Sequence, residues 1–304
     1  MYDTLHFWID RTLLHGDHFE IAKYLSNINV SKSVKRQSIK GGLDNFKVSI
    51  SEFGISMHGS LSKFYFGNNI QTLTLEQTIE AIQILSERLH VSLFEAKVSR
   101  IDFGKVFITK YAPTTYFKYL GNKRYFERVQ RTKHSICYET KKRVLAFYDK
   151  TIEAKKNRIS IPEQYENKNL LRYELRYISK ICTQLNEAVI TGETLCKKEF
   201  YSKLLQLWKD QFDSIEKIEL NHNIDYSNIK TPKDVEEQLF KLLLQEKGIE
   251  YIDGIVENLR MNQQFSDPKY YSRISDRLRA KFKISAEVQI SFLNELNKHI
   301  QTSC

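Results

Sequence analysis

The spacing of hydrophobic residues changes near residue 180, and this change restricts the folds open to the chain. Before that point apolar and polar residues alternate, which is typical of strands with one buried face. After it, apolar residues recur every three or four positions, which is typical of amphipathic helices. A chain of 304 residues, 41% of them hydrophobic, can bury a substantial core. We therefore predict an α+β fold, with an antiparallel-sheet domain over 1–185 and an all-helical domain over 186–304.

Local patterns assign the main elements of both parts. Residues 74–77 (Thr-Leu-Glu-Gln) have the form of a capping box, and an apolar stripe follows, so a helix is expected there. The stripe consists of Ile79, Ile82, Leu85 and Leu89. The expected strands contain Leu5, Phe7 and Ile9; Phe46, Val48 and Ile50; and the segments 55–60, 97–107, 143–150 and 171–178. The lysine-rich stretch 153–168 is expected to be an exposed loop, and later helices should start near Pro232 and Pro268.

The charge balance favours a polyanionic partner. The chain has 47 Lys and Arg against 37 Asp and Glu, a net charge of +10. Phosphates neutralised by such residues release condensed counterions, although an anionic membrane surface would suit the charge equally. No stretch approaches 18 apolar residues, and the first ten residues do not resemble a signal peptide. The four cysteines lack C-x-x-C spacing, which disfavours a zinc site or disulfide scaffold and favours a reducing cytoplasm.

Four of the expected strands place an unusual set of polar side chains on one face. Side chains at positions i and i+2 of a strand point the same way, so the apolar residues mark the core face and leave the polar residues opposite. These polar residues are His58; Arg100 and Asp102; Tyr148 and Lys150; and Arg172, Glu174 and Arg176. If the strands share one sheet, the set suits a divalent cation and a phosphodiester. One alternative is an ordinary solvated face of an antiparallel sheet. For either acid, a structural ion pair with a neighbouring arginine is another.

A tyrosine nucleophile would account for this set. A phenol with a pKa of about 10 needs help from a nearby cation or base. Lys150, two residues after Tyr148, is expected to lower the phenol pKa or bind the phosphate. A Mg²⁺ or Mn²⁺ ion held by Asp102 and Glu174, with His58 as a further ligand, would polarise the phosphate and stabilise the leaving 3′ oxygen.

Five segments of the first 180 residues resemble a known family in content, order and rough spacing. They are Met-Tyr-Asp-Thr-Leu-His-Phe at 1–7; a glycine-serine segment at 59–69 that ends in Gly-x-Asn; Ser-Arg-Ile-Asp at 99–102; Leu-Ala-Phe-Tyr-Asp-Lys at 145–150 with Glu153; and Arg-Tyr-Glu-Leu-Arg at 172–176. The family is that of the gene II-type replication initiators of filamentous phages and their plasmid and prophage relatives, distant kin of the HUH endonucleases.

The resemblance implies a rolling-circle replication initiator whose first domain, 1–185, is an HUH-like nicking and joining domain. Tyr148 would attack DNA, stay linked to the 5′ phosphate and leave a free 3′ OH for a host polymerase. The implied partners are single-stranded DNA, duplex origin DNA, and a host helicase and polymerase in the bacterial cytoplasm. Arg100, Arg172 and Arg176 would bind DNA, and Tyr138 is a candidate second tyrosine. The chain has no His-hydrophobic-His triplet, and His58 matches no histidine of the family.

The end of the chain offers a second DNA contact. Arg273, Arg277 and Lys281 recur at i+4 on a late helix, a short link at 282–285 follows, and another helix is expected over 287–300. Two helices with a short joint and a basic face suit a helix-turn-helix on origin DNA. The alternative is a packed helical hairpin with a solvated basic side.

Two other functions are compatible with this fold. A non-catalytic origin-binding or repressor protein would keep the arginines and lose the nucleophile or an acid. A relaxase or transposase would use the same chemistry in DNA transfer. Because Tyr148, Asp102 and Glu174 are all present, the enzyme is favoured over the repressor.

Overall fold

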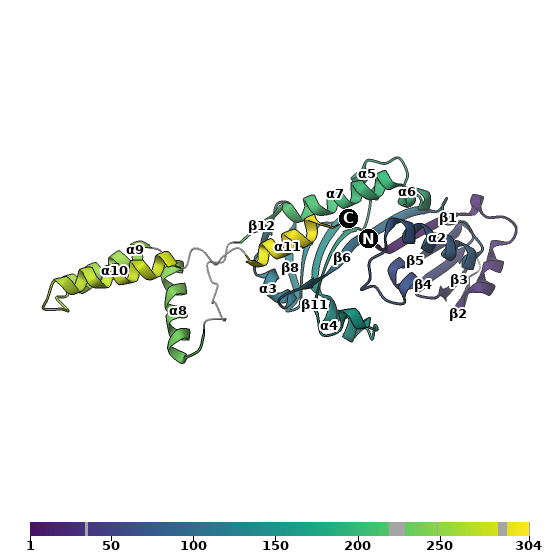
Figure 1. Cartoon of the computed structure of the whole chain (residues 1–304). Coiled ribbons are helices and arrows are strands. Elements are labelled where there is room, and N and C mark those ends of the chain that lie inside the picture. The colour runs from purple at the N-terminus through teal and green to yellow at the C-terminus, as the bar shows by residue number, and fades with distance from the viewer. Residues whose placement is uncertain (34–35, 219–228, 248, 285–290, 304) are drawn as a thin grey trace. The chain divides into compact units, whose positions relative to one another are not determined.

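A computed structural model describes residues 1–33, 36–218, 229–247, 249–284 and 291–303 (Figure 1). Its contacts divide the chain into two compact units. Unit 1 contains Met1–Glu216 and His299–Cys304, and unit 2 contains Lys217–Lys298. The division therefore falls later than the expected boundary at 185/186, because the helices that follow residue 180 pack onto the sheet. Helices α5 (Ile181–Leu185) and α7 (Lys198–Asp213) contact strands of the sheet, and α6 (Gly192–Cys196) packs against α7.

Unit 1 is built on a ten-stranded sheet in the order β2-β3-β4-β5-β1-β6-β11-β10-β9-β8. Every neighbouring pair is antiparallel, which confirms the predicted α+β fold class. The strands are β1 (Tyr2–Asp10), β2 (Ser26–Ser33), β3 (Arg36–Leu43), β4 (Phe46–Ser51), β5 (Gly54–Ser60), β6 (Lys97–Thr109), β8 (Glu127–Thr132), β9 (Ser135–Glu139), β10 (Arg143–Asp149) and β11 (Asn169–Tyr177). A separate two-stranded sheet joins β7 (Leu120–Lys123) to β12 (Ile215–Lys217).

One face of the large sheet carries the core, under α2 (Leu75–Leu89) and α7 (Figure 1). The ring of Tyr173 stacks on Phe147 at 4.4 Å and on Trp208 of α7 at 4.8 Å. Helix α2 begins with the predicted capping box at Thr74. The prediction that Ile79 belongs to the buried stripe of this helix was wrong. Its side chain is 38% exposed, because Thr78 and Ala81 occupy the buried positions of that turn.

The first unit also differs from expectation in the stretch 153–168 and in several strands. The stretch predicted as a loop begins with a helix, α4 (Lys150–Lys156), because the Asp149 side chain accepts a hydrogen bond from the backbone N–H of Ile152 at 3.0 Å. Lys150 is therefore the first residue of a helix and not the last of a strand. A short 3₁₀ turn, η3 (Glu163–Tyr165), lies further along the same stretch. The strands β2, β3, β7, β8, β9 and β12 were not predicted. In β2, exposed apolar residues such as Ile28 obscure the alternation.

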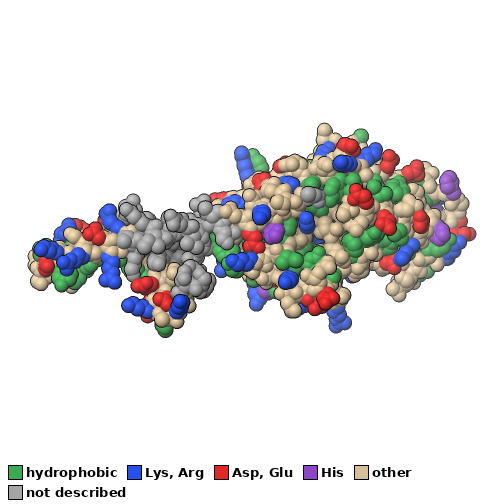
Figure 2. Space-filling view, in the orientation of Figure 1, with side chains coloured by type: hydrophobic (Ala, Val, Ile, Leu, Met, Phe, Trp, Pro, Cys, Tyr) green, Lys and Arg blue, Asp and Glu red, His purple; other side chains and the backbone are tan. Residues whose placement is uncertain are grey.

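Unit 2 is helical. It contains α8 (Pro232–Lys247), α9 (Ile249–Met261) and α10 (Lys269–Ile284), and α8 and α10 start where the prolines predicted. Helix α9 contacts both α8 and α10, and Arg279 of α10 donates to Asp253 of α9 at 2.6 Å. In Figure 2, Lys and Arg side chains gather over α9 and α10.

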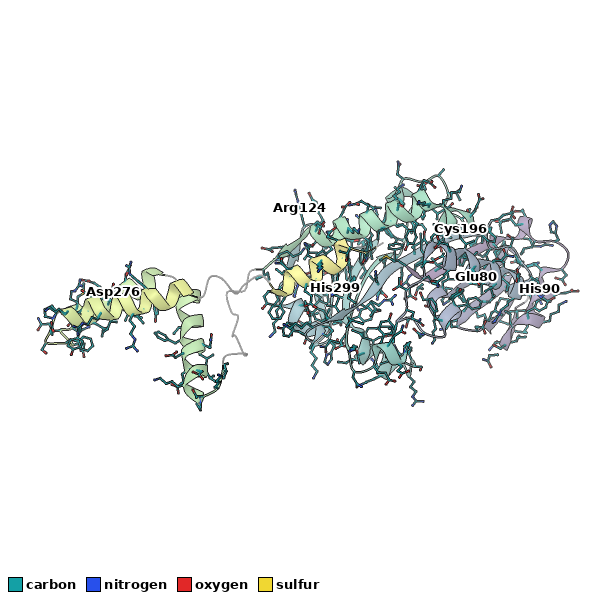
Figure 3. The ribbon with its side chains drawn as sticks, in the orientation of Figure 1. Glu80, His90, Arg124, Cys196, Asp276 and His299 are labelled. Atoms are coloured by element: carbon teal, nitrogen blue, oxygen red, sulfur yellow. The ribbon has the colours of Figure 1, made fainter. Side chains whose placement is uncertain are left out.

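The expected link at 282–285 differs from the structure. Residues 282–284 continue α10, whereas 285–290, including the start of the expected last helix, lie outside the described residues. The helix α11 (Ser291–Gln301) carries His299, which is labelled in Figure 3, and ends in unit 1. There the ring of His299 stacks on Phe107 at 5.5 Å. Since Gln301 also donates to Asp213, the end of this helix is held by the sheet unit. Within the described part of unit 2, α10 packs against α9 and α8.

Candidate active site and DNA-binding face

The face of the sheet opposite the core collects the predicted polar residues. The premise that their strands share one sheet is confirmed, since β5, β1, β6, β11 and β10 are consecutive neighbours. His58 is paired with His6, and His6 with Arg100; further along, Asp102 is paired with Arg176, and Tyr148 with Arg172. Residues far apart in the sequence thus lie on one surface.

Glu174 is the centre of this cluster. Its Oε1 accepts a hydrogen bond from the phenol of Tyr148 at 2.8 Å and another from Nε of Arg172. Its Oε2 accepts two from Arg176, at 2.8 and 2.6 Å. Glu174 and Arg172 are buried, whereas Tyr148 is half-buried. Glu174 therefore fixes the position of the phenol oxygen, while Arg172 and Arg176 neutralise the charge of the carboxylate.

The ion pairs extend from Glu174 in both directions. On one side, Arg176 lies 3.9 Å from Asp102, which accepts a two-pronged contact from Arg100 at 2.9 and 2.8 Å. On the other side, Arg172 donates to Asp3 at 2.6 Å. Acids and arginines therefore alternate along one row, and both predicted acids sit in the ion pairs that were the alternative interpretation. We call this row the paired network; it consists of Arg100, Asp102, Arg176, Glu174, Arg172 and Asp3.

Burial and neighbouring charge shift the pKa values of these groups in opposite directions. Burial, followed by the charge of Glu174, raises the pKa of Tyr148 well above its usual value of 10. Burial also opposes ionisation of Glu174, but the guanidinium groups of Arg172 and Arg176 outweigh it and hold the pKa of Glu174 well below its usual value. At Asp102 burial prevails over Arg100 and raises the pKa to about 6. At neutral pH the site therefore holds a neutral phenol beside an ionised Glu174.

Lys150 does not contact Tyr148 as the sequence predicts. Its side chain is fully buried, and its ammonium donates to Asn69 at 2.7 Å and to Glu153 at 2.5 Å. Arg172 donates to the backbone carbonyl of the same Asn69. Burial, followed by the charge of Arg172, lowers the pKa of Lys150. Lys150 thus connects the start of α4 to the segment that carries Asn69, and its ammonium group is not bonded to the phenol of Tyr148.

The predicted metal ligands do not form a ligand group as they are arranged. All four oxygens of Asp102 and Glu174 accept hydrogen bonds from arginine, and Arg100 lies between Asp102 and the histidines. The ring of His58 lies 4.9 Å from that of His6. Among the described residues, no three His, Cys, Asp or Glu side chains could together hold a metal ion. The donor set therefore does not fit a cation in this arrangement.

The three remaining predicted site residues are not members of the paired network. Tyr138 is fully buried on the core side and donates to the carbonyl of Gly121 at 2.7 Å, so its phenol cannot share strand transfer on the polar face. Arg273 and Arg277 are exposed on α10 of unit 2.

Sequence reasoning missed three residues that the structure brings to this face. Asp3 and His6 come from β1, and Asn69 follows α1 (Leu61–Phe66). Asp3 and Asn69 contact Arg172, and His6 contacts His58. A signal was available, because Asp3 and His6 belong to the opening segment and Asn69 to the Gly-x-Asn segment that carried the family resemblance.

A glycine makes room for the central carboxylate. Gly104 of β6 is paired with Glu174, and a Cβ there would lie 2.8 Å from Cγ of Glu174 and 2.4 Å from the carbonyl oxygen of Tyr173. Real Cβ atoms do not approach other atoms so closely. Only glycine therefore lets the Glu174 side chain lie against β6, between Asp102 and Tyr148.

Unit 1 thus combines an antiparallel sheet with a polar face that carries arginines and a half-buried tyrosine. Residues 1–227 match the family described as the N-terminal part of the replication-associated protein encoded by phage gene II. Because the match covers most of the chain, the protein belongs to this family of replication-associated proteins. It is a gene II-type rolling-circle replication initiator, as the five segments predict. Among curated proteins, none matches the sequence. No helix in the described part of the chain has the length and apolar content needed to cross a bilayer.

Proposed function

We propose that this initiator nicks one strand of origin DNA with Tyr148 and later rejoins it. The observation that carries the proposal is the 2.8 Å hydrogen bond from the Tyr148 phenol to Glu174, set between two arginines in a family of replication initiators. A nucleophile held by a carboxylate beside guanidinium groups is suited to attack on a phosphodiester.

In the nicking step the phenol oxygen attacks the scissile phosphorus and forms a new P–O bond. The bond from phosphorus to the 3′ oxygen breaks, so the DNA stays linked to Tyr148 through its 5′ phosphate. The phenol proton passes along the hydrogen bond to Glu174, and the leaving oxygen takes up a proton to become a free 3′ OH. Rejoining reverses these steps, with the 3′ OH attacking the phosphotyrosine.

Through Arg172 and Arg176, binding of the DNA phosphate would change how strongly Glu174 acts as a base. In the free protein Arg172 and Arg176 keep the pKa of Glu174 low, which makes it a weak base. A phosphodiester competes for the same N–H donors. Once it draws Arg176 away, the pKa of Glu174 rises and the carboxylate accepts the phenol proton more readily. Arg100 and Arg176 are half-exposed and can reach a phosphate from the surface.

A divalent cation, Mg²⁺ or Mn²⁺, remains part of the proposal. Asp102, Glu174 and His58 would have to leave their present partners to hold it, so no step is assigned to the ion. Wild-type protein in excess chelator tests the requirement: loss of nicking, restored by added Mg²⁺ or Mn²⁺, supports it, and full nicking in chelator excludes it.

The test of the nucleophile is incubation with labelled single-stranded DNA from the parent replicon, followed by a denaturing gel. We expect the wild type to form a covalent protein–DNA adduct and Tyr148→Phe to form none. Tyr125→Phe is the matched control, because Tyr125 is 81% exposed and lies outside the network, and it should behave like the wild type. An adduct of Tyr148→Phe at wild-type yield would assign the chemistry to another tyrosine.

The same gel separates the alternatives. A non-catalytic origin-binding or repressor protein would bind the DNA and form no adduct. A relaxase or transposase would form the adduct on a transfer sequence and not on the replication origin. We propose further that the free 3′ OH is extended by a host polymerase with a host helicase, in the bacterial cytoplasm.

Unit 2 is proposed to bind duplex origin DNA through Arg273 and Arg277. Each phosphate contact on B-DNA contributes about −0.9 to the slope of log affinity against log salt. Replacing both arginines with Ala should therefore flatten the slope by about 1.8 and weaken duplex binding. Nicking of a short single-stranded substrate should persist. An unchanged slope would make α10 a scaffold.

A further inference from the structure

A groove lies on the polar face of unit 1, away from Tyr148. It has a volume of about 580 Å³ and is formed by β2, β3, β4 and β5. The polar side chains that line it include Asn29, Lys40, Lys47, Ser49, Ser56 and His58. Lys47 and Ser49 alternate with the buried Phe46, Val48 and Ile50, so they are on the face that carries the paired network.

The groove is basic, and its lysines are not neutralised. Lys40 and Lys47 are both exposed. None of the described residues that line the groove is Asp or Glu, and within the described residues neither lysine forms an ion pair. The positive charge there is therefore available to a ligand, whereas the guanidinium groups near Tyr148 already face carboxylates.

Planar side chains continue the groove toward the centre of the sheet. On β1, Trp8 is paired with Ser56 and His6 with His58, and all four are on the polar face. Trp8 and His6 are half-buried, so part of each ring remains accessible. Lysines for phosphates beside rings on which bases can stack are the features that bind single-stranded nucleic acid. A duplex keeps its bases stacked on each other and cannot use the rings.

The groove and Tyr148 can serve one DNA strand. From β4 to β10 the sheet order runs through β5, β1, β6 and β11, which is five strand spacings of ~4.8 Å, or on the order of 24 Å. Arg100, paired with His6, lies between them on the same face. DNA in the groove is therefore a flanking segment and not the scissile phosphate.

We propose that the groove formed by β2–β5 binds a single-stranded DNA segment that flanks the strand held at Tyr148. Lys40 and Lys47 contact its phosphates, and its bases stack on Trp8 and His6. That the segment flanks a nick rests on the proposed nicking function, whereas binding of the single strand does not. The test therefore measures binding alone.

The experiment is fluorescence anisotropy with a labelled oligothymidylate that carries no nick site, in chelator, over a range of salt. The double variant Lys40→Ala/Lys47→Ala should bind more weakly, and its salt slope should flatten by about 1.4, or ~0.7 for each lost contact on a single strand. Lys197→Ala/Lys198→Ala is the matched control. Both lysines are exposed; Lys197 is the N-cap of α7 and pairs with Glu193, and Lys198 is the first residue of the helix. Because α7 packs on the opposite face of the sheet, their loss should change neither quantity.

A second variant tests stacking. Trp8→Ala should weaken oligothymidylate binding by about 5- to 150-fold, and Trp8→Phe should restore much of it, because a phenyl ring still stacks. Thermal unfolding of each variant checks that the fold is intact. If Trp8→Ala fails to fold, Trp8→Phe compared with Trp8→Leu measures the same effect.

Three outcomes decide the matter. If the groove double variant matches the α7 control in affinity and slope, the proposal is wrong. If it weakens duplex and single-stranded DNA equally, the groove does not select single strands, and the proposal is also wrong. A selective loss on single strands supports it, even if the wild type forms no adduct, since that result would contradict only the nicking function.

Discussion

The two halves of the polar face handle charge differently. Around Tyr148 the arginines of the paired network lie against carboxylates and are partly or fully buried. Over β2–β5, Lys40 and Lys47 are exposed and the described lining contains no acid. Both halves contain basic side chains, and both are supplied by neighbouring strands of one sheet. Composition alone therefore cannot tell them apart.

The difference separates positioning from binding. A buried guanidinium that already has a carboxylate partner adds little affinity for DNA until the partner is displaced, but it holds side chains in one arrangement. An exposed lysine without a partner contributes to DNA affinity directly, through counterion release. We expect mutations in the network to change stability and chemistry, and mutations in the groove to change binding.

The largest expected effect contrasts one residue from each half. Arg172→Ala should lower the free energy of unfolding by about 3–5 kcal/mol, because Asp3 and Glu174 lose a buried partner. Lys47→Ala should change it by no more than about 0.5 kcal/mol, as an exposed residue without a partner. Urea denaturation at pH 7 measures both. Equal costs would mean that the two halves do not differ in this way.

The next effect is on the pH dependence of stability. The pKa of Asp102 is about 6 in the folded protein against an ordinary 3.8, so the folded state binds the extra proton between these values. Its contribution therefore favours folding at pH 4 and is lost as the pH rises through 6. Asp102→Asn should remove a decline on the order of 3 kcal/mol, seen by comparing unfolding at pH 4 and pH 7 with the wild type. A wild-type decline that persists in the variant would contradict this assignment.

The third prediction concerns the room that glycine gives to Glu174. Gly104→Ala should cost about 1–3 kcal/mol, because the new Cβ meets Cγ of Glu174 and the backbone of β11. The displaced carboxylate should also reduce adduct yield at Tyr148. Oligothymidylate binding should be unchanged, since the groove lies on other strands. Weakened groove binding in this variant would show that the halves are coupled.

The smallest expected effect lies at the junction with the groove and has the opposite sign to that of Asp102. Burial, followed by Arg100 and His58, lowers the pKa of His6 from 6.5 to about 4. Its contribution to stability is complete above pH 6.5 and is lost as the pH falls toward 4. His6→Gln should flatten this loss, by less than the Asp102 effect because His6 is only half-buried. Thermal unfolding at pH 4.5 and 7 measures it, and an unaltered loss would contradict a neutral His6.

Local sequence patterns predicted much of the sheet and the composition of its polar face. Alternation placed Leu5, Phe7 and Ile9 inside, and the same rule put Asp102, Tyr148 and Glu174 on the opposite face. The capping box located α2, and prolines located α8 and α10. Strand alternation, the capping box and the proline helix starts each depend on residues within a few positions of each other. They can therefore be read from the sequence without knowledge of the fold.

Only the tertiary structure decided which polar groups meet. Asp3 contacts Arg172, and Asn69 contacts both Arg172 and Lys150, across long stretches of chain that no local pattern spans. Strand order made Arg100 the neighbour of His6 and turned two expected metal ligands into ion-pair partners of arginine. The groove exists because β2 and β3 extend the sheet beyond β4, and β2 has too little alternation to be recognised. Strand pairing and burial are set by the whole fold. They determine that the arginines of the network are paired with acids while Lys40 and Lys47 of the groove are exposed.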